Sequence, residues 1–142
     1  MTGIIVTGHG TFAGGITSGL RLLTGEPVCY ESVDFLPDDS VEELAGKLKG
    51  AVDGLGECDQ IMIYADLTGG SPFNVSIRMK MEADKPMEVI GGANLPMILD
   101  GYLAREQAES VQALAQSALE AGRDAMVWFQ ASQGFDDDAY EE

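Results

Sequence analysis

Short apolar runs alternate along the chain with longer stretches whose apolar residues recur every three or four positions. The runs predict strands, and the helical spacing predicts the helices between them. The predicted strands cover residues 3–8, 28–35, 60–66 and 87–91, with a last one at 125–129. The predicted helices cover residues 12–23, 41–55, from 71 onward, 95–104 and 108–119. Strand–helix units in series predict an α/β fold with a doubly wound, mostly parallel sheet.

Turn and cap residues set the expected ends of these helices. Gly25 follows the last apolar position of the first helix and is expected to end it. Ser40 and Glu43 have the spacing of a capping box. Ser71 is the expected N-cap of the helix that contains Pro72 at its first position. Gly122 is expected to close the last helix.

The length of 142 residues is typical of one domain with a hydrophobic core. We expect a domain over residues 1–130 and an acidic tail over residues 131–142, which we expect to be disordered. The formal net charge is −16, which disfavours nucleic acid and anionic membrane surfaces and favours a basic protein partner. No stretch approaches the roughly 20 apolar residues of a membrane span, and no signal peptide is visible, so a cytoplasmic protein is expected.

Few residues are suited to hold a metal or a nucleotide. Cys29 and Cys58 stand apart and lack metal-ligand spacing, and the chain has one histidine, so no metal site is expected. In a cytoplasmic protein the two cysteines are expected to be free thiols. The segment "GTFAGG" lacks the spacing of a dinucleotide fingerprint, and no P-loop lysine follows it. We therefore expect no cofactor.

Polar residues collect where the predicted strands end. The first strand ends in "TGHG", the third in "DLTGGSPFN" and the fourth in "GGANLP". In an open α/β sheet, ligands bind outside the carboxyl ends of the strands, at the point where the strand order reverses. With the order 2-1-3-4, that point lies between the first and third strands. His9 and Asp66 would then flank one crevice.

A carboxylate beside an imidazole can accept the Nδ1–H hydrogen. This fixes the tautomer, leaves Nε2 with a free lone pair and favours a cationic ring. Such a histidine can act as a nucleophile or as a general base. His9 and Asp66 are therefore the candidate catalytic residues.

An anion site is expected beside them, at the start of the helix that follows the third strand. A Gly-Gly turn that leads into a helix N-terminus presents unpaired backbone N–H groups. Ser71, Gly70 and Thr68 are the candidate phosphate-binding residues. The alternative for Ser71 is that it only starts the helix.

The residues alone leave three functions open. One is transfer of a phosphoryl group onto and off His9, and another is hydrolysis assisted by His9. The third is a non-catalytic, anion-binding regulatory module, which would not become covalently labelled.

The chain resembles the enzyme IIA domain of the mannose family (mannose/fructose/sorbose type) of the bacterial phosphoenolpyruvate:sugar phosphotransferase system. The resemblance extends from residue 3 to about residue 129. It is carried by "IIVTGHG", "VDFLPDDSVEEL", "DLTGGSPFN" and "EVIGGANLPMI". The combination of "GGSPFN" with "GANLPM" is its most specific part.

The resemblance implies a phosphotransferase with a phosphohistidine intermediate. The phosphorylated histidine falls on His9, its supporting aspartate on Asp66, and the serine that holds the phosphoryl oxygens on Ser71. HPr would donate the group to Nε2 of His9, which would pass it to a separate IIB subunit. Membrane IIC and IID subunits would take part indirectly. The resemblance also implies a homodimer in which the strand at 125–129 is exchanged between subunits.

The chain departs from the family pattern after Asp66, where some members carry Thr-Trp and this chain carries Leu67 and Thr68. A related alternative is the phosphocarrier subunit of a dihydroxyacetone kinase system. The segments "GGSPFN" and "GGANLPM" match the mannose-type sugar carriers better.

Overall fold

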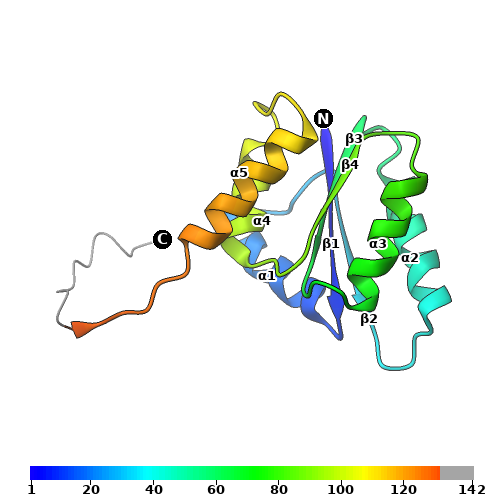
Figure 1. The fold of residues 1–142 in the computed structure, drawn as a ribbon, viewed down its shortest axis with the longest axis horizontal. Coiled ribbons are helices and arrows are strands. Elements are labelled where there is room, and N and C mark those ends of the chain that lie inside the picture. The colour runs from blue at the N-terminus through cyan, green and yellow to red at the C-terminus, as the bar shows by residue number, and fades with distance from the viewer. Residues whose placement is uncertain (132–142) are drawn as a thin grey trace.

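A sheet of four parallel strands lies at the centre of the computed structural model, which describes residues 1–131 (Figure 1). Its strand order is β2-β1-β3-β4, as predicted. β1 and β3 are the inner strands, so their carboxyl ends are adjacent. The strands are β1 (Thr2–His9), β2 (Tyr30–Phe35), β3 (Gln60–Ala65) and β4 (Met87–Ile90).

Helices cover both faces of this sheet, which confirms the doubly wound architecture (Figure 1). One face carries α1 (Phe12–Thr24), α4 (Leu95–Ala104) and α5 (Val111–Asp124). The other carries α2 (Val41–Gly54) and α3 (Ser71–Glu82). No helix in the described part of the chain is long and apolar enough to span a membrane.

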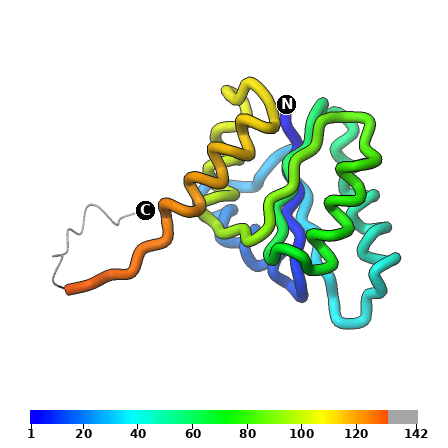
Figure 2. Tube along the Cα trace, in the orientation of Figure 1, coloured from blue at the N-terminus to red at the C-terminus, as the bar shows by residue number. Residues whose placement is uncertain are grey.

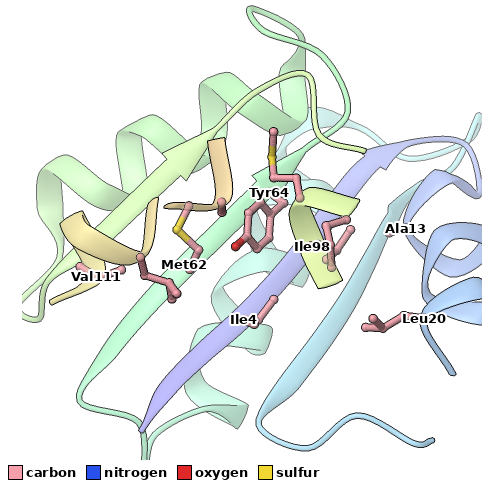
Figure 3. Close-up of a cluster of buried hydrophobic side chains, with 11 residues drawn as sticks. Ile4, Ala13, Leu20, Met62, Tyr64, Ile98 and Val111 are labelled. Carbon is pink, nitrogen blue, oxygen red and sulfur yellow. The ribbon is translucent and has the colours of Figure 1, made fainter. Parts of the chain in front are cut away.

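The core consists of two hydrophobic clusters, one on each face of the sheet, because alternate residues of a strand point to opposite faces. Ile4, Met62 and Tyr64 pack against α1, α4 and α5, and Figure 3 shows this cluster. Ile5 and Ile63 pack against α2 and α3. The central strands are therefore buried on both faces, as their continuous apolar runs predict.

Two of the expected helix ends are confirmed and two are wrong. Ser40 and Glu43 form the capping box at α2, and Gly25 follows α1 with a φ of 78°. Gly122 does not close a helix but lies inside α5. A Cβ there would stand 2.8 Å from the Cε of Met97, so this glycine allows α5 to pack closely on α4.

Ser71 is the first residue of α3 rather than its N-cap, and Gly70 takes the cap position with an extended backbone. This cap residue lies against the side chain of His9. A Cβ on residue 70 would stand 2.7 Å from Cε1 of His9, so a residue with a side chain would collide with the ring.

Residues 125–129 do not form the predicted strand. Ala125 caps α5, and the chain then extends away from the body of the protein (Figure 2). Met126, Val127 and Trp128 are 71%, 64% and 82% exposed. A strand needs a neighbour to pair its backbone groups, and among residues 1–131 no strand pairs with this segment. All but the first residue of the predicted tail, 131–142, lies outside the described residues.

Candidate functional site

The candidate site lies at the carboxyl ends of the two inner strands, at the lower end of the sheet in Figure 1. His9 is the last residue of β1, and Asp66 directly follows β3. The parallel register places Thr7 beside Ala65, and the Asp66 backbone N–H donates to the Thr7 carbonyl at 3.2 Å. The strand order therefore brings His9 and Asp66 together, as predicted.

The Asp66 carboxylate holds both the backbone and the ring of His9. Its Oδ2 accepts the His9 backbone N–H at 2.9 Å and lies 2.9 Å from Nδ1. Its Oδ1 accepts the backbone N–H of Leu67 at 2.8 Å. An ionised carboxylate only accepts hydrogen bonds, so the hydrogen of a neutral imidazole belongs on Nδ1. Nε2 then carries the lone pair.

The Asp66 side chain is 13% exposed, against 45% for His9. Burial by itself raises the pKa of Asp66. The hydrogen bonds from His9 and Leu67, with the charge of the ring, outweigh it, so the pKa lies below its ordinary value. The carboxylate therefore stays ionised and can balance a positive charge on the imidazole.

Glycines make space around this pair. The ring of His9 lies over Gly70, where a Cβ would stand 3.3 Å from Nε2. At Gly8, a Cβ would stand 2.8 Å from Cγ of Asp66 and 2.6 Å from Cδ1 of Phe12. Gly70, one of the candidate phosphate-binding residues, thus also provides the surface on which the ring rests.

The N-terminus of α3 lies beside Nε2. The Asn74 side chain donates to the Gly69 carbonyl at 2.9 Å, and the first helical bond runs from the Asn74 backbone N–H to the Gly70 carbonyl at 2.8 Å. Gly69 has a φ of 88°, which favours glycine in this turn. Within the described part of the chain, the Ser71 hydroxyl makes no hydrogen bond. This helix end can therefore offer backbone N–H groups and a hydroxyl to an anion.

Thr68, the third candidate phosphate-binding residue, contacts the loop that follows β4. A Cβ on Gly91, just after β4, would overlap its hydroxyl oxygen. This contact places Thr68 over the loop between β4 and α4 and joins two loops at the carboxyl edge of the sheet.

Phe35 is a site residue that the sequence analysis missed. Its ring centroid lies 5.9 Å from that of His9, with the ring planes tilted by 60°. The register pairs the two residues directly, and Gly10, with a φ of 58°, donates its N–H to the Phe35 carbonyl at 2.7 Å. Aligning the ends of the first and second predicted strands would have indicated this contact.

Chemically, the arrangement is an oriented imidazole with a free Nε2, a partly buried counter-charge at Nδ1 and a helix N-terminus nearby. These parts suit transfer of an anionic group to Nε2. Among residues 1–131, no group of three or more His, Cys, Asp or Glu side chains gathers that could hold a metal ion.

Comparison with known proteins identifies the relatives of this chain. The family model described as "PTS system fructose IIA component" matches residues 3–119. The mannose-specific EIIAB component of Escherichia coli K12 is 32% identical over 123 residues, which are 87% of this chain and 38% of that protein. The fructose-specific EIIA component of Bacillus subtilis is 27% identical over 106 residues, 75% of this chain and 72% of that one.

Solved structures of EIIA components resemble this chain as well. The phosphotransferase system component EIIA from Streptococcus agalactiae is 32% identical, with a TM-score of 0.85 over 91% of this chain and 98% of that one. The mannose/sorbose-specific IIA subunit of Enterococcus faecalis shares the fold with a TM-score of 0.79. The chain spans about 38% of the length of the mannose-specific relatives that it matches.

Proposed function

The chain belongs to the family of PTS fructose IIA components, in the mannose group of sugar-transport EIIA proteins, and from this we propose that His9 is its phosphoryl carrier. Phospho-HPr would donate the group to Nε2, and His9 would pass it to a separate IIB subunit. The observation that carries the proposal is the 2.9 Å contact between Nδ1 of His9 and Oδ2 of Asp66, with Nε2 left for the incoming group.

The proposed transfer is a displacement at phosphorus. The Nε2 lone pair forms the new N–P bond, while the P–N bond to the donor breaks and the donor nitrogen keeps its electron pair. Nδ1 retains its hydrogen, so the phosphorylated ring gains positive character next to the Asp66 carboxylate. Phosphoryl transfers of this kind are catalysed mainly by positioning of the reactants and by electrostatic stabilisation of the equatorial oxygens of the phosphoryl group. The α3 N-terminus and the Ser71 hydroxyl would stabilise these oxygens.

The acidic charge of the chain supports docking of a basic phosphoryl donor. We expect the exchange to take place in the cytoplasm, with membrane IIC and IID subunits acting later in sugar uptake.

We also propose that the chain forms a homodimer in which residues 125–129 pair with the sheet of the partner. The extended course of this segment and the exposure of Met126, Val127 and Trp128 support this. Sedimentation should then give the mass of a dimer, and Val127→Asp should shift it towards that of a monomer. A wild-type chain that sediments as a monomer at high concentration would contradict the dimer.

The carrier role is tested by intact-mass spectrometry after incubation with phosphoenolpyruvate, enzyme I and HPr. Wild-type protein should gain one acid-labile, base-stable phosphoryl group, and His9→Ala should gain none. No gain in wild type, with HPr shown to be phosphorylated, would favour the non-catalytic anion-binding function instead.

A further inference from the structure

Two cysteines lie together at the amino end of the sheet, opposite to His9. Cys29 directly precedes β2, and Cys58 lies just before β3. These strands flank β1 on either side. Both cysteines line one surface cavity of about 430 Å³, and Cys29 packs against the hydrophobic cluster that contains Cys58. The chain's two thiols therefore share one site.

Gly3 in β1 makes the space that Cys58 occupies. A Cβ on residue 3 would stand 3.0 Å from the Cys58 Sγ and 3.3 Å from its Cβ. Residue 3 lies in the strand between β2 and β3, so its missing side chain leaves a gap between the two segments that carry the cysteines. Any larger residue would press on the Cys58 thiol and on the Leu55 side chain, whose Cδ1 would also stand 3.0 Å from that Cβ.

The backbone of each cysteine is anchored by a cation. The Cys29 carbonyl accepts hydrogen bonds from the Ile4 N–H and from Nη1 of Arg105, both at 3.0 Å. The Cys58 carbonyl accepts one from Nζ of Lys85 at 2.8 Å. Cys29 has a φ of 51°, a left-handed conformation that non-glycine residues rarely adopt. Such a conformation persists only where its surroundings enforce it, and it occurs preferentially at functional sites.

The two thiols differ in their access to solvent. Cys58 is only 3% exposed, whereas Cys29 is partly exposed. Burial, and then the neighbouring Cys29 thiol, raise the pKa of Cys58. A reagent that enters the cavity thus meets Cys29 first, and Cys58 is placed to react with whatever forms on it.

The rim of the cavity is acidic. Glu31, Asp53 and Glu57 line it together with the two cysteines, and Asp53 forms an ion pair with Lys49 at 2.9 Å. The whole chain carries a charge of −16, so anionic reagents are repelled and cationic ones attracted.

We propose that Cys29 and Cys58 form a redox-active dithiol site that a small cationic or neutral disulfide oxidises to an intramolecular disulfide. The Cys29 thiolate attacks one sulfur of the small disulfide. The S–S bond breaks, and the released thiolate takes up the proton that Cys29 lost. The Cys58 thiolate then attacks the Cys29 sulfur, and the second small thiol leaves with the proton from Cys58. The protein loses two electrons and two protons, and the small disulfide gains them. This inference does not depend on the proposed phosphocarrier function.

The test uses the full-length reduced protein and three small disulfides: cationic cystamine, neutral 2-hydroxyethyl disulfide and anionic glutathione disulfide. After an acid quench, free thiols are alkylated and the intact mass is measured. We expect a product lighter by two hydrogens, with both cysteines protected from alkylation. Cystamine should react fastest and glutathione disulfide slowest, and the rates should converge at high salt. Mixed disulfides on both cysteines, covalent dimers or rates independent of reagent charge would overturn the proposal.

Serine variants of the two cysteines separate the attack of Cys29 on the small disulfide from the closure of the intramolecular disulfide by Cys58. Cys58→Ser should stop at the mixed disulfide between Cys29 and cysteamine. Cys29→Ser should react slowly, because the remaining thiol is buried. Gly3→Ala should make the disulfide easier to reduce by roughly tenfold, which is about 30 mV for a two-electron couple. Equal reactivity of the two serine variants would contradict the proposal that Cys29 reacts first. The two serine variants test this order even if Gly3→Ala does not fold.

Discussion

Replacing Gly70 by alanine tests the placement of the His9 ring directly. The backbone of residue 70 has φ −78° and ψ 172°, which alanine adopts without strain. The new Cβ would, however, stand 2.7 Å from Cε1, whereas ordinary contacts begin at 3.4 Å. The ring must therefore move by about 0.7 Å or more, which is enough to stretch its 2.9 Å contact with Asp66 beyond good hydrogen-bond length. Losing a charge-assisted hydrogen bond of about 1.5–3 kcal/mol should slow phosphoryl acceptance by roughly 10–100-fold.

The assay is the single-turnover rate of transfer from phospho-HPr, combined with nitrogen chemical shifts of His9 that report its tautomer. Gly50→Ala is the matched control, because Gly50 lies in α2 and the added methyl group would meet no atom within 4 Å beyond its chain neighbours and its own helix backbone. The control should keep the wild-type rate and gain about 0.5–1 kcal/mol of stability. A Gly70→Ala protein with the wild-type rate and unchanged His9 shifts would refute the reasoning.

Further predictions concern Asp66 and the fold. Asp66→Asn should slow transfer by roughly 10²–10⁴-fold in the same assay, as amide-for-carboxylate changes behind catalytic histidines do. Because folding lowers the pKa of Asp66, its carboxylate stabilises the fold fully above its unfolded pKa of about 4, and this contribution is lost as the pH falls through the folded value. The stability difference between wild type and Asp66→Asn in urea should therefore shrink with acidification, and a difference independent of pH would contradict it. Tyr64→Phe should raise the free energy of unfolding by about 1 kcal/mol, since the buried Tyr64 hydroxyl has no partner among residues 1–131. Gly101→Ala should lower the free energy of unfolding by about 1–3 kcal/mol, because the new Cβ overlaps the Tyr64 hydroxyl. Tyr64→Phe should rescue part of this loss, and additive effects in the double variant would count against the contact. Ser40→Ala should cost about 1 kcal/mol by removing the cap of α2, and an unchanged urea midpoint would argue against that cap.

The sequence predicted those features that depend on local pattern and on the rules of parallel sheets. Continuous apolar runs identified the inner strands, and their order placed His9 beside Asp66. The errors arose at two glycines that face distant residues. Gly70, against the His9 ring, takes the N-cap of α3 in place of Ser71, and Gly122, against Met97, lies inside α5. Neither partner is visible from the sequence around the glycine.

Residues 125–129 show a different limit of sequence patterns. Their apolar character is real, but a strand also requires a neighbour with free backbone groups. In the described part of the chain no strand pairs with this segment, so its apolar pattern indicates that it can pair and does not establish a paired strand. The same capacity supports the proposed exchange between subunits.

Both ends of β1 carry a glycine that leaves space for a side chain from a neighbouring segment. The interior of the strand is buried on both faces by apolar side chains and has no room for reactive groups. At its carboxyl end, Gly8 gives the Asp66 carboxylate space to reach His9, and at its amino end Gly3 gives space to the Cys58 thiol. In each case a neighbouring segment inserts its functional group where the strand has no side chain. Glycines at strand ends should therefore be examined for the groups that fill their space, and here those groups include the Asp66 carboxylate, beside Phe12, and the Cys58 thiol, beside Leu55.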